Sequence, residues 1–162
     1  MRPVYPVVIV VLTVVAPLVH IIVVLAGSGW TADPWPVIGS AFVFWAVGIR
    51  LLAAGLSQIL RPGFTSQGIL GTKDGSANQI VQELGAANVG MGVIGLVATL
   101  WLAEWIPAAA LVACIFLGFA GLRHVAKKGK NLNEAVATYT DIFVALVLAA
   151  YLVATLVTTL AR

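Results

Sequence analysis

The chain has 162 residues, of which 61% are hydrophobic and only 9% are charged, and its mean hydropathy is +1.06. A soluble domain carries about 25% charged residues, so this composition excludes a soluble fold and predicts one integral membrane domain over residues 1–162. The net charge of +3 does not indicate nucleic-acid binding, because the basic residues fall in loops. The single Cys114 excludes an internal disulfide and a cysteine metal cluster.

Five apolar segments follow one another along the chain, each with about 20 residues or more, which is enough to cross a bilayer as a helix. The first segment is longer than the roughly 7–15 residues of a signal-peptide core, so we interpret it as a retained span. Tryptophans mark the start of the second segment and the end of the third, as is typical of a membrane–water interface. The sequence therefore predicts an all-α fold, a polytopic membrane helix bundle with five transmembrane helices at residues 4–26, 35–60, 77–102, 107–125 and 132–160.

The longest connection, residues 61–78, contains the apolar side chains Phe64 and Ile69 among turn-forming residues. Two interpretations of it remain open. It is either a plain surface loop, or a segment that folds back against the mouth of the bundle as a short helix with Thr65 as its N-cap.

The distribution of charge predicts an orientation in the membrane. Five crossings place the two termini on opposite sides, and nearly all basic residues fall on the side of the N-terminus. The positive-inside rule makes that side cytoplasmic, so we predict a protein of the inner (plasma) membrane with its C-terminus outside. The basic residues on the predicted cytoplasmic side are Arg2, Arg61, Lys73, Arg123, Lys127, Lys128 and Lys130, and only Arg162 falls on the other.

Several strongly polar residues lie inside the predicted spans at matching depths. Arg50 and Asn88 each lie ~15 Å from the cytoplasmic end of a span, and Asp141 lies ~13 Å deep in the last span. A lone arginine at this depth costs about 2.5–3.5 kcal/mol, and a carboxylate at the same depth offsets that cost. Asp141 is the best partner for Arg50, with Glu83 as the second candidate. The predicted buried network, which is also the candidate ligand-binding site, comprises Arg50, Gln58, Glu83, Asn88, His124 and Asp141.

The third span carries small or polar residues on two opposite faces. Gly85, Asn88 and Gly92 lie on one face, and Glu83 and Ala87 lie on the other. We therefore expect this helix at the centre of the bundle, with neighbours packed on all sides.

Two other patterns are better explained by packing than by chemistry. GMGVIG (Gly90–Gly95) matches a dinucleotide-binding fingerprint, but it lies in the middle of a span rather than in a turn between a strand and a helix, so its glycines are interpreted as helix contacts. His20 has no second His, Cys or acidic residue at ligand spacing and is interpreted as a core histidine. We predict no catalytic residue, no metal ion and no cofactor.

Three stretches resemble an uncharacterised family of small bacterial multi-span membrane proteins. They are VFWAVGIRLLAAGLSQILRPGFT, VQELGAANVGMGVIGL and GLRHVAKKGKNLNEAVATYTDIFVAL. The resemblance implies a bacterial membrane protein and no mechanism. More loosely, the size and the helical bundle are similar to DoxX-like proteins and to the sterol-isomerase and sigma-2-receptor group, in which membrane acids hold amine-like or carbocation-like ligands. No motif matches that group residue by residue, so no site is carried over.

Three functions remain open on these grounds. The first, which we favour, is a non-enzymatic bundle that binds an apolar or amphipathic small ligand or serves as a subunit of a membrane complex. The second is a small proton-coupled transporter in which Glu83 and Asp141 titrate beside Arg50. The third is a membrane enzyme that acts on a lipid-like substrate, with Glu83 or Asp141 as acid or base. Arg50 and Asp141 have a purely structural alternative, since a buried ion pair can simply fix helix register. The lipid bilayer is the expected surrounding, and the small-residue faces are compatible with a homodimer.

Overall fold

The computed structural model describes residues 4–69 and 71–161, and every regular element in these residues is a helix. Five helical stretches are long and apolar enough to cross a membrane, and their ends agree with the predicted spans to within about four residues. The five-span prediction is therefore confirmed. The elements are α1 (Val4–Val10), η1 (Val11–Val15), α2 (Ala16–Gly27), α3 (Pro34–Phe42), η2 (Val43–Ile49), α4 (Arg50–Leu60), α5 (Pro62–Ser66), α6 (Asn78–Leu100), η3 (Ala103–Trp105), α7 (Ile106–Ala126) and α8 (Leu132–Leu160).

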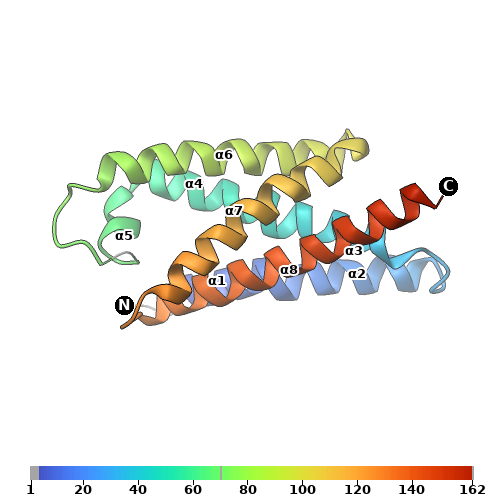
Figure 1. The fold of residues 1–162 in the computed structure, drawn as a ribbon, viewed down its shortest axis with the longest axis horizontal. Helices are drawn as coiled ribbons and strands as arrows, with labels where there is room; N and C mark the ends of the chain where they lie inside the picture. The colour runs from blue at the N-terminus through green and yellow to red at the C-terminus, as the bar shows by residue number, and fades with distance from the viewer. Residues whose placement is uncertain (1–3, 70, 162) are drawn as a thin grey trace.

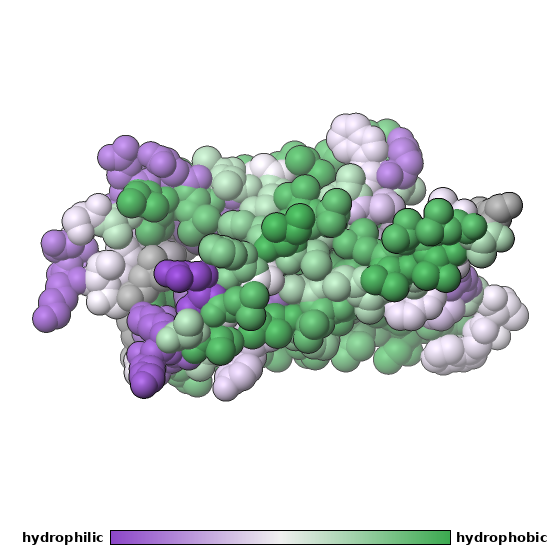
Figure 2. All heavy atoms as spheres, viewed as in Figure 1, coloured by the Kyte–Doolittle hydropathy of each residue, from purple (hydrophilic) through white to green (hydrophobic). Residues whose placement is uncertain are grey.

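The helices form an elongated bundle whose first and last described residues lie at opposite ends (Figure 1). Hydrophilic residues gather at these two ends, and a broad apolar belt lies between them (Figure 2). Such a belt matches the hydrocarbon of a bilayer. We call one end the basic end after its exposed or partly exposed residues Arg61, Lys73, Arg123, Lys127, Lys128 and Lys130, and the other the tryptophan end after Trp30, Trp35, Trp101 and Trp105. Arg2 and Arg162 lie outside the described residues.

Two of the spans contain a π-helical segment. The segments are η1 and η2, and each is continuous with an α-helix on both sides. A π-helical turn holds more residues than an α-helical one, so it shifts the angular position of every side chain that follows it. Arg50 is the first residue after η2, so its direction depends on this local irregularity.

The α4–α6 contact is made by glycines that let the two backbones touch. A Cβ added to Gly55 would lie 2.5 Å from the carbonyl oxygen of Gly85, and one added to Gly92 would lie 2.5 Å from the backbone nitrogen of Leu52. Gly95 packs against η2, where an added Cβ would lie 3.0 Å from the backbone nitrogen of Gly48. The packing interpretation of the GMGVIG run is thus confirmed for Gly92 and Gly95, whereas Gly90 meets nothing within 4 Å. We call this contact the glycine seam.

Helix α7 starts beside α6 at the tryptophan end and crosses the bundle to pack along α8 at the basic end (Figure 1). Gly121 allows the close approach, since a Cβ there would lie 2.6 Å from the side chain of Ile142. Helices α6 and α7 therefore diverge toward the basic end. The expectation that the third span is surrounded on all sides is wrong, because its face with Glu83 and Ala87 is exposed.

The long connection folds back over the basic end, as one of the two interpretations predicted. Its short helix α5 begins at Pro62, which suits a first helical position, so Thr65 is a buried residue inside the helix and not its N-cap. The ring of Phe64 packs edge-on against the ring of Tyr5, with 5.7 Å between the ring centroids. In addition, Asn131 donates a 3.0 Å hydrogen bond to the carbonyl of Gly68.

The exposed tip of the same connection is a local turn closed by Asp74. The hydroxyl and the backbone N–H of Ser76 both donate to the Asp74 carboxylate. These hydrogen bonds favour the ionised form, so the pKa of Asp74 lies below its ordinary value.

Candidate intramembrane polar site

The centre of the candidate site is a buried ion pair between two spans. Arg50, at the start of α4, donates through Nη2 to Oδ1 of Asp141 in α8, and the two side chains are 7% and 8% exposed. The depth match at the sequence level favoured this partner over Glu83. Because each charge satisfies the other in a low-dielectric setting, removing one alone leaves an uncompensated buried charge.

A second polar pair joins α6 to α4 next to the first. The Asn88 amide nitrogen donates a 2.7 Å hydrogen bond to the side-chain oxygen of Gln58. Asn88 is buried and Gln58 is half-buried. The glycine seam explains this short bridge, because Gly85 and Gly92 bring the α6 backbone against α4 on either side of Asn88.

Both pairs line one cavity of about 130 Å³ near the basic end. Tyr5 from α1, Thr65 from α5 and Ile69 after α5 close it on other sides. A neighbouring cavity of about 160 Å³ between α1, α4 and α5 shares several of these walls. We call the first one the polar cavity. It brings together five of the six predicted site residues, namely Arg50, Gln58, Asn88, His124 and Asp141.

Glu83 is the predicted residue that lies elsewhere. It is exposed, and its carboxylate accepts a 3.2 Å hydrogen bond from Gln79 one turn earlier in α6. Five residues separate Glu83 from Asn88, which places them about 140° apart around the helix. Because Asn88 faces α4, Glu83 points away from Arg50, and the prediction that it joins the buried network is wrong.

A second carboxylate, that of Glu134, is buried at the basic end and was not among the predicted site residues. Glu134 in α8 is 1% exposed and accepts a 3.0 Å contact from Lys127 and a 3.3 Å contact from Nδ1 of His124. Its sequence signal was its position, because Glu134 lies two turns before Asp141 on the same stripe of α8. His124 therefore links this ion cluster to the polar cavity, which it also lines.

Two atoms of the polar pairs lack a partner. Among the described residues, the buried side-chain atoms without a hydrogen bond are Nε1 of Trp45, Nη1 of Arg50 and Oδ1 of Asn88. Arg50 and Asn88 both line the polar cavity and are 6% and 4% exposed. Each unsatisfied buried polar group costs about 1–3 kcal/mol, so the cavity favours an occupant that both accepts from Arg50 and donates to Asn88.

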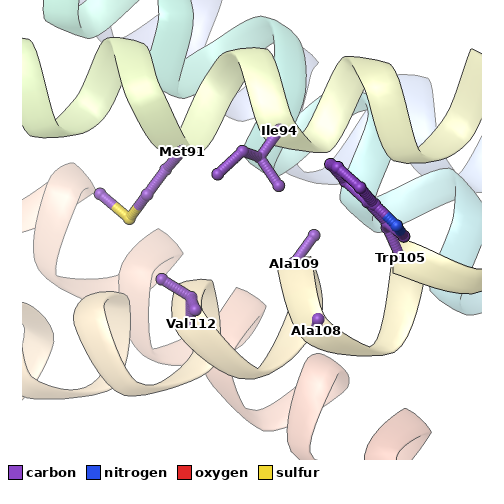
Figure 3. Close-up of a pocket in the computed structure, with 6 residues that line it drawn as sticks. All are labelled: Met91, Ile94, Trp105, Ala108, Ala109 and Val112. Atoms are coloured by element: carbon purple, nitrogen blue, oxygen red, sulfur yellow. The ribbon is translucent and has the colours of Figure 1, made fainter. Parts of the chain in front are cut away.

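The divergence of α6 and α7 creates an apolar groove of about 870 Å³ on the outside of the bundle. Its walls include Ala87 and Met91 from α6 and Val112 and Ile115 from α7, and Arg123 lies at its basic end. Figure 3 shows the adjoining hollow toward the tryptophan end, about 340 Å³ in volume, where side chains of Met91, Ile94, Ala109 and Val112 face one another across the two helices beside Trp105. We call the larger space the α6–α7 groove.

The α6–α7 groove and the polar cavity share part of their walls. Leu84, Phe116, Ala120 and His124 line both spaces. These side chains therefore form the partition between an apolar space that faces the bilayer and a polar space inside the bundle.

Comparison with known proteins gives a family and no activity. The chain matches the family of unknown function DUF6790 over residues 4–160, so it belongs to that family. No curated protein and no solved structure matches the chain. The predicted resemblance to an uncharacterised family of multi-span membrane proteins is confirmed, and the looser likeness to DoxX-like proteins stays a prediction.

Proposed function

We propose that this member of a family of unknown function is a non-enzymatic membrane protein that binds the polar group of a small ligand in the polar cavity. The observation that carries the proposal is the pair of unpartnered buried atoms, Nη1 of Arg50 and Oδ1 of Asn88, which belong to two residues that line the same cavity. One is a donor and the other an acceptor, so a single ligand group bridging them would satisfy both.

A purely structural ion pair accounts for less of this arrangement. An ion pair that only fixes helix register needs no cavity beside it, and its spare guanidinium nitrogen would be expected to bond a backbone carbonyl. The transporter hypothesis is weakened as well, because it relied on Glu83 as a second titrating group, and Glu83 lies on the exposed face of α6. Of the three hypotheses, ligand binding is therefore the one that accounts for both the cavity and its two unpartnered polar atoms.

Native mass spectrometry of the protein released gently from its own membrane tests this function. We expect one small molecule per chain in the wild type, its loss in Asn88→Leu, and its retention in Glu83→Gln. Asn88→Leu removes the acceptor while keeping the number and branching of the side-chain heavy atoms, and Glu83→Gln is a matched control on the same helix outside the cavity. A chain that carries a stoichiometric partner subunit and no small molecule would contradict the proposal and assign the ion pair a structural role.

A further inference from the structure

We infer that the ligand is an uncharged single-chain amphiphile with a hydroxyl in its head group, and that it enters the polar cavity from the bilayer through the α6–α7 groove. This inference rests on the proposed function and adds the ligand class and the route. It depends on three features of the structure, which are the charge balance of the cavity, its shared wall with the groove, and the cover over the basic end.

The charge balance selects an uncharged head group. The guanidinium of Arg50 already has the carboxylate of Asp141 as its counter-ion, so this pair has no net charge to offer. An anionic or cationic head group would place an uncompensated charge beside two buried side chains, which is strongly unfavourable.

The two unpartnered atoms select a hydroxyl within that class. A hydroxyl oxygen accepts from Nη1 of Arg50 while its proton is donated to Oδ1 of Asn88. Rotation of the amides of Asn88 and Gln58 would present a donor in place of the acceptor, and a hydroxyl matches either arrangement. With Asn88 oriented as in the structure, a ketone or ether can only accept, so it would leave Oδ1 of Asn88 unsatisfied.

The shared wall selects an apolar chain and its path. The groove is apolar over most of its length and has a volume of about 870 Å³, within the roughly 300–1,000 Å³ typical of ligand pockets. Leu84 from α6 and Phe116 from α7 stand between this groove and the polar cavity, and both are only partly buried. In this inference Leu84 and Phe116 turn aside to admit the ligand, so that one molecule places its head at Arg50 and its chain along the groove.

On the side of the basic end, α5 covers part of the polar cavity. Thr65 and Ile69 line the polar cavity from the side of α5. The hydrogen bond from Asn131 to Gly68 and the Tyr5–Phe64 ring contact hold this cover in place. We therefore take the bilayer, reached through the α6–α7 groove, as the source of the ligand.

Binding of defined probes to the full chain in phosphatidylcholine nanodiscs tests the ligand class. The probes are monolaurin, ionised laurate, protonated dodecylamine, dodecane and glycerol, quantified by mass spectrometry after the nanodiscs are isolated. We expect one monolaurin per chain and at least about tenfold weaker binding of the other four, because each lacks the neutral hydroxyl head or the chain. Binding of laurate or dodecylamine as tight as that of monolaurin would overturn the inferred head group.

A matched pair of variants tests the route. Ala87→Trp fills the α6–α7 groove without touching the polar cavity, whereas Ala86→Trp adds the same ring on a neighbouring exposed position about 100° around α6. We expect Ala87→Trp to weaken monolaurin binding by about tenfold or more and Ala86→Trp to leave it unchanged. Equal binding in the two variants would overturn the groove as the site of the chain.

The failure of this inference is distinguishable from that of the proposed function. Binding of glycerol as tight as that of monolaurin, with loss in Asn88→Leu, would overturn the amphiphile and leave the polar cavity as a binding site. Absence of any bound probe, together with absence of any small molecule in the native spectrum, would overturn both.

Discussion

The two sides of α6 pack in opposite ways, one against a backbone and the other against an open groove. Toward α4, glycines bring the backbones so close that a Cβ on Gly92 would lie 2.5 Å from a backbone nitrogen. Toward α7, the same helix presents Leu84, Ala87 and Met91 to a groove of about 870 Å³. A single helix thus has one closed face and one open face.

The difference shows how one helix can fix a site and admit a ligand at the same time. The closed face holds Asn88 at a set distance from Gln58 and beside Arg50, because there is no room for the two backbones to slide. The open face leaves Leu84 free of such constraint on the other side of the polar cavity. The closed face of α6 therefore positions Asn88 rigidly, and the open face of the same helix provides the ligand's way in.

The largest expected effect comes from breaking the ion pair between α4 and α8, which lies beside the closed face of α6. Arg50→Ala leaves Asp141 buried without a counter-ion, so we expect a loss of about 3–5 kcal/mol in the free energy of unfolding. Unfolding by denaturant in mixed micelles measures it, with Arg61→Ala, at an exposed position, as the control. The double variant Arg50→Ala/Asp141→Ala should lose less than the sum of the single variants. Additive losses would mean that the two residues do not interact in the folded protein.

The glycine seam gives the next largest effect. Gly92→Ala forces its methyl against the backbone of Leu52, so we expect a loss of about 1–3 kcal/mol, as for an overpacked core. Gly90→Ala lies in the same helix where a Cβ meets nothing within 4 Å, and alanine is the better helix former, so its stability should be unchanged or slightly higher. Equal losses in the two variants would show that helix propensity, and not contact with α4, determines the result.

Substitutions of Glu134 and Glu83 compare the stability contributed by a buried carboxylate with that contributed by an exposed one on α6. Glu134→Gln weakens the contacts with Lys127 and His124 while leaving a buried amide, so we expect a loss of about 1–2 kcal/mol. Glu83→Gln changes an exposed residue, so its effect should lie within about 0.5 kcal/mol. Thermal unfolding in detergent compares the two variants directly. A larger loss in Glu83→Gln would place that side chain inside the bundle.

The parts of this structure that the sequence predicts are those that depend on depth alone. The apolar stretches fix where each span starts and ends to within a few residues. Counting from these ends places Arg50 and Asp141 at the same level, and burial of a charge then makes their pairing favourable. No angular information is needed for either conclusion, which is why both agree with the structure.

The parts that the sequence does not predict depend on angle. Nothing in the residues of η2 signals a π-helical turn, and that turn changes the direction of everything after Val43. Small or polar residues on two opposite faces of α6 are consistent with two arrangements. Either a helix packs on each face, or a helix packs on one face and the other faces lipid. The sequence cannot separate these arrangements, because an apolar residue such as Ala87 can face lipid, and Glu83, near the start of α6, can reach water at the basic end. Glu83 was misplaced for this reason.

The smallest expected change in stability is that of a substitution on the open face of α6, measured without a ligand. Ala87→Trp adds a large ring to α6 at a point where the α6–α7 groove has room for it, so the free energy of unfolding should change by less than about 0.5 kcal/mol. Unfolding by denaturant in mixed micelles measures this variant together with Gly92→Ala and Gly90→Ala, which makes the two faces of one helix comparable in one series. A loss as large as that of Gly92→Ala would mean that α6 and α7 close on each other in the membrane. The groove would then be filled by the protein itself, and the two faces of α6 would differ in residue type and not in packing.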